Sequence, residues 1–303
     1  MKTFFAITKR NIKMFFKDKG MFFTSLITPV ILLVLYSTFL ADVYRDSFVS
    51  SMPDGFTIPS SVIDATVGGE LLSSLLAVCC VTVAFCSNLQ MVQDKISGAR
   101  KDILITPIRK SKLAISYFAS SFLTTLIISY TATAAGFIYI AIKGWYMSFA
   151  DVLLILLDVF ILTMFGVVIS SVINVFLSTQ GQASAVGTVV SAGYGFICGA
   201  YMPISSFGEG LQKECSLLPG TYGTSLIRNH CLNGAYREMS KNHMPDDVIE
   251  KIKDGIDCNL YFFGHYVSIG AMYAIMVVSI AVLVGAFVLI NILKKIKNYQ
   301  LSL

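Results

Sequence analysis

The sequence predicts an all-α integral membrane protein, on the evidence of its hydropathy, its long apolar runs and the placement of its basic residues. Of its 303 residues, 55% are hydrophobic and only 14% are charged, and the mean hydropathy is +0.72. A soluble domain averages about a quarter charged residues. A chain of this length could not cover itself with polar surface in water, so we expect a single transmembrane domain over residues 1–303.

Six runs are long and apolar enough to cross a hydrocarbon core, which needs roughly 20 apolar residues. They are rich in Leu, Ile, Ala and Gly and lack the alternation of barrel strands, so we expect six transmembrane helices. The first run is longer than the apolar core of a cleaved signal peptide, about 7–15 residues, and is expected to remain attached. The expected spans are Met21–Ala41, Val67–Met91, Leu113–Ile142, Val152–Leu177, Ala183–Met202 and Phe263–Leu293.

The placement of Lys and Arg predicts the orientation. Fifteen of the 23 such residues lie in the N-terminal tail, the stretch 95–112 and the C-terminal tail. Cytoplasmic segments of membrane proteins are enriched in Lys and Arg. We therefore expect a multi-pass protein of the cell membrane with both termini and this stretch in the cytoplasm.

The segment 1–19 is expected to form an amphipathic helix in the membrane interface. At about 100° per residue, its basic residues fall on one side and Phe4, Ile7 and Phe15 on the other. A basic face next to a span suits anionic lipid headgroups. Membrane lipid is therefore an expected partner.

On the external side, the sequence predicts a first loop over Asp42–Ala65 and a larger region over 203–264. The part Ile204–Ser225 is apolar but broken by glycines and prolines. That pattern is typical of a re-entrant segment in contact with protein rather than of a full crossing. Asp246–Ile256 is expected to form a short amphipathic helix that begins after Pro245.

The cytoplasmic stretch 92–112 is more ordered than a plain basic loop. Ile96 and Ile103 share one helical face, opposite charged residues. Proline disfavours helix in the residue before it, whereas Thr at the N-cap followed by Pro begins a new helix. We expect the second span to continue as a short helix, to end near Ile105 and to restart at Pro107. Such a compact basic knob suits docking into a cleft of a soluble partner.

This stretch also resembles a known family. GARKDILITPIRKSKL is similar to the cytoplasmic loop of the membrane subunits of type-2 ABC exporters, the family that includes the ABCG-like half-transporters. The matching residues are Gly98, Leu104, Thr106, Pro107 and Ile108. The sequence departs at Ala99, where Thr is usual, and at Asp94-Lys95, where an acidic residue followed by Arg is usual.

A second segment, GAYMPISSFGEGLQKECSLLPGTYGTSLIRN, resembles a Gly-x-x-x-Pro element of the same family, followed by a Leu-Pro turn and an Arg. The corresponding residues are Gly199, Pro203, Leu218, Pro219 and Arg228. The two segments occur in the family's order, and the resemblance extends over nearly the whole chain.

The resemblance implies the translocation subunit of an ATP-driven exporter. A coupling helix would dock on a separate ABC-type ATP-binding subunit, which would bind ATP and Mg, and a second permease copy or a sister permease would complete the path. This chain would supply no catalytic residue, and no nucleic-acid partner is expected. The implied coupling residues are Gly98, Arg100, Lys101, Asp102, Thr106, Pro107 and Arg109. The expected residues of the path or its re-entrant cap are Gly199, Pro203, Pro219 and Arg228, together with Asp158 as a possible path residue.

No sequence pattern indicates a catalytic, cofactor or metal site in the chain. It contains no Gly-Lys pair, so it has no P-loop. The histidines and nearby cysteines of the last external region fit no zinc spacing, and we expect them to be solvated or hydrogen-bonded. These residues are His230, His243, His265, Cys231 and Cys258.

The chain has seven cysteines. Four lie inside expected spans and are interpreted as packing residues. The other three, Cys215, Cys231 and Cys258, lie outside, where one pair could form a disulfide.

Asp158 is the one charged residue well inside an expected span, and it keeps two alternatives open. An intramembrane carboxylate is costly and indicates function by default, so an ion-driven carrier that uses Asp158 is one alternative. Hydration or a hydrogen bond to a neighbouring helix would explain the residue equally well. A non-transporting membrane sensor or scaffold is a further reading of the chain. Glu70, at the outer edge of the second span, is expected to be interfacial.

Small residues recur in the expected span Ala183–Met202. Because small residues let helices approach closely, this span could pack within the chain, form a dimer seam or line a path that changes shape. The largely uncharged spans favour a hydrophobic or amphipathic substrate, such as a drug, an antimicrobial peptide or a lipid-like molecule.

Overall fold

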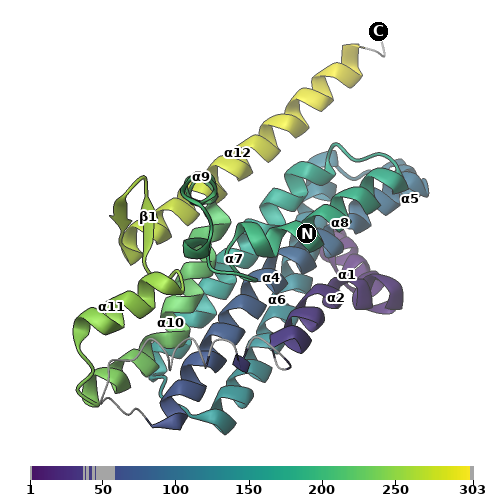
Figure 1. Ribbon diagram of the computed structural model, residues 1–303. Coiled ribbons are helices and arrows are strands. Elements are labelled where there is room, and N and C mark those ends of the chain that lie inside the picture. Colours follow the sequence, from purple (N-terminus) through teal and green to yellow (C-terminus); the bar gives the residue numbers. More distant parts are fainter. Residues whose placement is uncertain (1, 37, 39–40, 43–44, 46–58, 301–303) are drawn as a thin grey trace.

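The computed structural model describes residues 2–36, 38, 41–42, 45 and 59–300 (Figure 1). Most of the expected loop Asp42–Ala65 lies outside these residues, as do the side chains of Lys294, Lys295 and Lys297. The described part is mostly helical and contains one two-stranded hairpin.

The bundle is built from long helices, and the smaller elements other than α5 lie between α8 and α12 in the chain. The longer helices are α1 Lys2–Lys17, α2 Lys19–Leu35, α4 Ser60–Ile96, α6 Lys110–Lys143, α7 Phe149–Asn174, α8 Gln180–Ile197, α10 Pro219–Lys241 and α12 Ile269–Gln300. The shorter elements are α5 Ala99–Ile105, the 3-10 turn η2 Ile204–Ser206, α9 Glu209–Ser216, α11 Asp246–Gly255, β1 Leu260–Phe262 and β2 His265–Val267.

Helix α4 is the centre of the bundle (Figure 1). It contacts α2, α6, α7, α8 and α10, and its most apolar stretch is buried throughout. Helix α12 lies at the edge, where it contacts α7 and α10 and exposes most of its apolar stretch. Since α12 is also one of the most hydrophobic helices, its exposed face is suited to lipid.

Four of the described helices, α4, α6, α7 and α12, are long and apolar enough to cross a membrane. Helices α1 and α2 together form a further candidate, bent by 71°. The bend falls at Asp18, whose side chain accepts a hydrogen bond from the Met21 backbone at 3.0 Å and so caps α2. These findings confirm an all-α, multi-pass membrane protein.

The expected fifth and sixth spans differ from the observed helices. Helix α8 has 18 residues and is not among the helices apolar enough to span. It ends at Ile197 rather than at Met202, because Gly199 turns the chain with φ of 73°. Helix α12 begins at Ile269 rather than at Phe263, because residues 260–267 form the hairpin.

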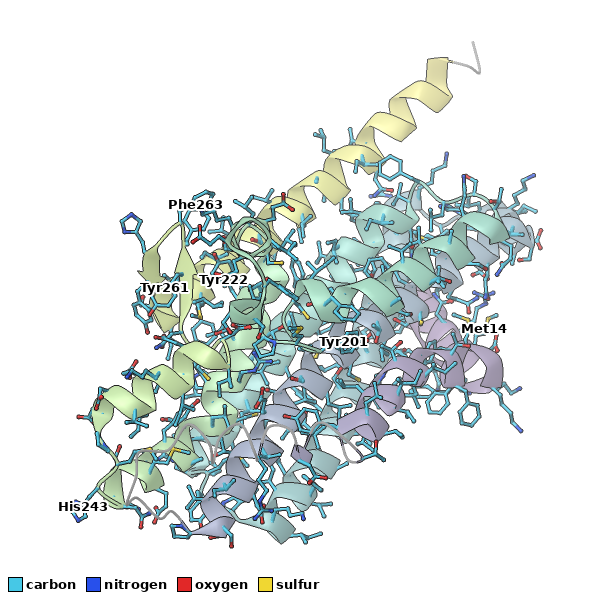
Figure 2. The ribbon with its side chains drawn as sticks, viewed as in Figure 1. Met14, Tyr201, Tyr222, His243, Tyr261 and Phe263 are labelled. Carbon is cyan, nitrogen blue, oxygen red and sulfur yellow. The ribbon has the colours of Figure 1, made fainter. Side chains whose placement is uncertain are left out.

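The external region contains the short helix that the sequence predicts. Helix α11 begins directly after Pro245, and its apolar side chains Val248, Ile249 and Ile252 pack with α10. It lies at the opposite end of the molecule from α5; His243 and Met14 mark the two ends in Figure 2.

All seven cysteines are free and buried, so Cys215, Cys231 and Cys258 form no disulfide. Burial raises the pKa of the Cys258 thiol to about 12, and Tyr236 Oη lies 3.3 Å from its sulfur. The thiol is therefore protonated and unreactive at neutral pH.

Helix α7 approaches α4 closely at Gly166. A Cβ at this position would lie 2.8 Å from the carbonyl oxygen of Cys80 and 3.1 Å from Cα of Val81. Both atoms belong to the backbone of α4, so they cannot yield as a flexible side chain would. The contact therefore depends on glycine.

The substitution Gly166→Ala should destabilise the protein by about 1–3 kcal/mol, because the added methyl group overpacks the α4–α7 contact. Thermal unfolding of the detergent-solubilised protein measures the effect. Gly187→Ala in α8 is the matched control, since a Cβ there meets no described atom within 4 Å. Equal melting temperatures for the two variants would contradict the assignment.

Candidate functional site

The segment 97–109 forms a compact knob at one end of the bundle (Figure 1). The knob consists of α5 and the turn that follows it. The second span does not run on into α5 as predicted: α4 ends at Ile96, and Gly98 breaks the helix with φ of 85°. This left-handed conformation favours glycine, which has no Cβ to clash. The break lets α5 leave the axis of α4.

The predicted role of Thr106 is also corrected. Thr106 closes α5 rather than capping the next helix: its Oγ1 donates to the carbonyl oxygen of Ile103 at 2.5 Å. Residues 106–109 are non-helical, and α6 begins at Lys110 instead of Pro107. Pro107 keeps Thr106 extended, as the residue before a proline prefers.

The knob presents a mixed polar and apolar surface. Of the predicted coupling residues, Gly98 and Arg100 are half-buried, and the others are exposed: Lys101, Asp102, Thr106, Pro107 and Arg109. Between them, Ile105 is 83% exposed. A large apolar side chain left in water at the tip of a short helix is suited to a protein contact.

The opposite face of the knob is seated on the bundle. Ile103, Leu104 and Ile108 pack on one apolar cluster at which several helices meet. The cluster combines Ile7 of α1, Met91 of α4, Leu113 and Tyr117 of α6, Val175 after α7, and Phe287 and Ile290 of α12. The apolar cluster under α5 thus joins residues of four helices and the residue that follows α7.

Buried polar contacts lock the same region. The carboxylate of Asp94 is buried and accepts hydrogen bonds from Arg10 at 2.8 Å and 3.3 Å, from Tyr117 at 2.6 Å and from Gln90 at 3.0 Å. These contacts tie α4 to α1 and α6. A charge so enclosed is stable because each oxygen is paired.

The neighbouring Lys95 fastens α4 to the end of α7. Its ammonium group donates to the carbonyl oxygens of Asn174, Val175 and Leu177 at 3.0–3.2 Å. The first two carbonyls lie at the end of α7, where a helix leaves its last carbonyls unpaired, and the third lies three residues beyond the helix. Asp94 and Lys95, where the sequence departs from the family pattern, thus hold the seat of the knob together.

At the other end of the bundle, Arg228 of α10 is the centre of a second network. It is only 1% exposed, and its guanidinium donates to the carbonyl oxygens of Ile256 at 2.8 Å and Gly199 at 2.7 Å and to Ser74 Oγ at 3.2 Å. Asp257 lies 3.7 Å away. The structure therefore brings Arg228 and Gly199 together. The same hydrogen-bond network includes α4 through Ser74.

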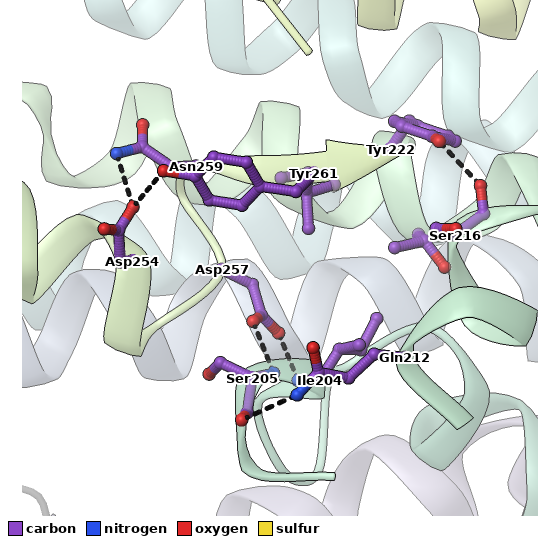
Figure 3. Close-up of a pocket in the computed structure, with 11 residues that line it drawn as sticks. Ile204, Ser205, Gln212, Ser216, Tyr222, Asp254, Asp257, Asn259 and Tyr261 are labelled. Carbon is purple, nitrogen blue, oxygen red and sulfur yellow. Dashed lines mark hydrogen bonds between the residues drawn. The ribbon is translucent and has the colours of Figure 1, made fainter. Parts of the chain in front are cut away.

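Asp257 also stabilises the turn that follows α8. Its carboxylate accepts backbone hydrogen bonds from Ile204 at 2.5 Å and Ser205 at 3.0 Å (Figure 3). Pro203 directly precedes this turn, and Pro219 is the first residue of α10. Burial raises the pKa of Asp257, whereas the Arg228 charge and the backbone donors act in the opposite direction.

A pocket of about 250 Å³ lies beside this turn (Figure 3). Its polar lining groups mostly bind one another: Asn259 donates to Asp254, and Tyr222 donates to the carbonyl oxygen of Ser216. These bonds hold the pocket walls together and leave few groups for a ligand.

Asp158 is hydrogen-bonded to neighbouring helices. Its carboxylate lies 2.5 Å from Nδ1 of His230 in α10 and accepts a 2.5 Å bond from the hydroxyl of Tyr273 in α12. All three residues are away from the knob. Glu70 of α4 is buried within the protein, close enough to Arg228 and Asp257 to interact with their charges.

No group of three or more His, Cys, Asp or Glu side chains in the described part of the chain could hold a metal ion. His230 serves as the partner of Asp158, a pairing that sequence spacing did not reveal. Asp257, the counter-ion of Arg228, was likewise missed, because its position after α11 carries no motif. The buried Asp94 and Asn88 could have been found as polar residues within an apolar helix.

The comparisons with known proteins agree with the geometry. The family described as ABC-2 type transporter matches residues 2–231, which is most of the chain. The comparison with curated proteins gives no match, and neither does the comparison with solved structures. The family match includes the whole knob, Arg228 and the seat residues of α1, α4, α6 and the end of α7, but not those of α12. The chain therefore belongs to the ABC-2 type transporter family, as a transmembrane component.

Proposed function

We propose that the chain is the membrane subunit of an ATP-driven exporter in which α5 and the turn 106–109 dock on a separate ATP-binding subunit. The observation that carries the proposal is the exposed tip of α5 on a rigid seat. Ile105 projects from the knob, while Ile103 and Leu104 fix it to the bundle.

The seat explains how motion of a partner would reach the membrane. The cluster under α5 is shared by α1, α4, α6, α12 and the end of α7. Hydrogen bonds of Asp94 and Lys95 hold α4 beside α1 and beside the end of α7. Packed elements move as units rather than deform continuously. A push on α5 would thus tilt the whole bundle.

ATP and Mg would bind on the partner, since the chain has no P-loop. We assign the α5 end and both termini to the cytoplasm on the distribution of Lys and Arg. The segment 203–219 would cap the translocation path from the external side, and Arg228 would hold that cap. The substrate class that suits such uncharged spans is hydrophobic or amphipathic.

A second permease copy, or a sister permease, would cover the outer face of α8. A Cβ at Gly181, Gly187 or Gly193 would meet no described atom within 4 Å, so packing within this chain does not explain these glycines. Small residues on an exposed face allow another helix to approach closely.

An ion-driven carrier is the second candidate, because the buried Asp158 and His230 and the half-buried Tyr273 form a titratable cluster. The geometry favours a structural role, since the cluster joins α7 to α10 and α12 and each carboxylate oxygen has a partner. The two candidates differ in what they require of the charge on Asp158.

The substitution Ile105→Ser should weaken binding of the ATP-binding subunit about tenfold, because it removes an apolar anchor at the centre of the proposed contact. Co-purification and ATP-driven transport in vesicles measure the loss. Ile142→Ser is the control: Ile142 is 78% exposed at the opposite end of α6. Equal binding by both variants would reject α5 as the docking site.

The substitution Gly98→Leu should uncouple ATP hydrolysis from transport, since a side chain at positive φ costs about 1–2 kcal/mol and would redirect α5. Space is not limiting, because a Cβ there meets nothing within 4 Å. Gly255→Leu, in similarly open space but without a positive φ, should keep coupling intact. Normal transport per ATP hydrolysed in Gly98→Leu would contradict the prediction.

The substitution Asp158→Asn should lower stability by about 1–3 kcal/mol through loss of a charged hydrogen-bond acceptor, yet leave ATP-dependent transport in place. Thermal unfolding and vesicle transport, with and without an ion gradient, separate the two candidates. Transport that follows the gradient, needs no ATP and is abolished in Asp158→Asn would establish the carrier instead.

A further inference from the structure

The β1–β2 hairpin carries a largely aromatic surface. Tyr261, Phe262, Phe263 and Tyr266 are each exposed, with Phe263 at 54%. The rings contact one another: Phe262 and Phe263 at 4.9 Å between centroids, and Tyr261 and Tyr266 at 6.1 Å. In Figure 2, Phe263 lies at the outer edge of the molecule. Tyr261 pairs with Tyr266 on one face of the hairpin, whereas Phe262 pairs with His265 on the other face and contacts Phe263 at the tip. These two ring pairs together make up the aromatic patch of the hairpin.

The tip of the hairpin holds an aromatic residue where the backbone disfavours it. Phe262 pairs with His265, so the loop consists of Phe263 and Gly264 alone. Both have positive φ, 48° and 85°, as a type I′ turn requires. Asn, Asp or Gly is preferred at the first of these positions, and a bulky side chain there is an outlier. Such outliers concentrate at functional positions.

The charge pattern separates the hairpin from the rest of its region. The run 260–269 contains no Asp, Glu, Lys or Arg, whereas the ten residues of α11 contain six. A water-facing hairpin would be expected to resemble α11. An uncharged surface that combines Phe with Tyr is typical of the boundary between lipid and water, where the rings lie among acyl chains and the hydroxyls stay hydrated.

The position of the hairpin fits that boundary. The apolar helix α12 begins at Ile269, two residues after β2, and exposes Val277, Val278 and Val282 along its lipid-suited face. Figure 1 shows the hairpin beside the start of α12, set back from the end of the bundle that α11 and the start of α4 form. The aromatic patch thus continues the exposed apolar surface of a span.

We propose that the aromatic tip of the β1–β2 hairpin inserts into the membrane–water interface on the side opposite α5 and anchors the start of α12 there. The partner is the lipid surface itself. With the orientation proposed above, this is the outer leaflet. The anchor would fix the depth of α12, whose contacts with the protein are limited to one side.

Single-tryptophan fluorescence tests this directly, because the chain has only one tryptophan, Trp145. In a Trp145→Phe background, Phe263→Trp places a reporter at the tip, and Tyr266→Trp provides a second one that does not depend on the positive φ of the turn. The full-length protein is reconstituted into phosphatidylcholine–phosphatidylglycerol vesicles that contain phosphatidylcholine brominated either near the headgroup or near the chain end.

Two further reporters calibrate the depth. Lys251→Trp, on the exposed face of α11, serves as the aqueous reference, and Val282→Trp, on α12, as the lipid reference. The reporters at 263 and 266 should be blue-shifted relative to the one at 251. They should be quenched more by bromine near the headgroup than near the chain end, and less by aqueous iodide than the reporter at 251.

Two results would overturn the proposal. Iodide quenching at 263 and 266 as strong as at 251, without a bromine effect, would place the hairpin in water. Shielding from both bromine and iodide would place it against protein, in a contact with another chain. Because the readout is independent of transport, neither result depends on the proposed exporter function.

Discussion

The rest of the structure depends on one constraint: α4 is buried on every side within a membrane domain, so each polar group that it carries must be paired inside the protein. Thr82 donates to its own helix backbone, four residues back. Asn88 donates to Ser170 and Ser171 of α7 at 3.0 Å and 2.7 Å. These few polar side chains select which helices surround α4 and in which register they lie.

The same constraint links the two ends of the bundle. At one end, Asp94 binds α1 and α6, and the cluster under α5 closes over it. At the other end, Ser74 of α4 accepts a bond from Arg228, which holds the turn after α8 and the segment after α11. A single continuous helix therefore connects the proposed docking knob to the proposed cap of the path.

The fold could be anticipated where a signal is local. The hydropathy identified the class, the apolar face of Asp246–Ile256 identified α11, and the Thr-Pro pair identified the end of the short helix in the knob, whereas the break at Gly98 was not predicted. The errors are also local in origin. Thr106 fits the role of a helix N-cap as well as that of a C-terminal stop, and the chain uses it as the stop. The length of an apolar run cannot separate a hairpin from the helix that follows it. The predicted last span therefore begins at Phe263, although α12 begins at Ile269.

What the sequence by itself determined is the membrane class, the number of candidate apolar helices to within one or two, the basic end and the place of the short helix after the second span. Each follows from composition or from spacing within about a dozen residues. Only the tertiary structure decided that Asp158 pairs with His230, that Arg228 reaches Gly199 and Ile256, and that the 260–267 aromatics are presented on a hairpin. The reason is physical: in a low-dielectric interior a polar group must find whichever partner packing brings within about 3 Å, and that partner is set by helix contacts rather than by distance along the chain.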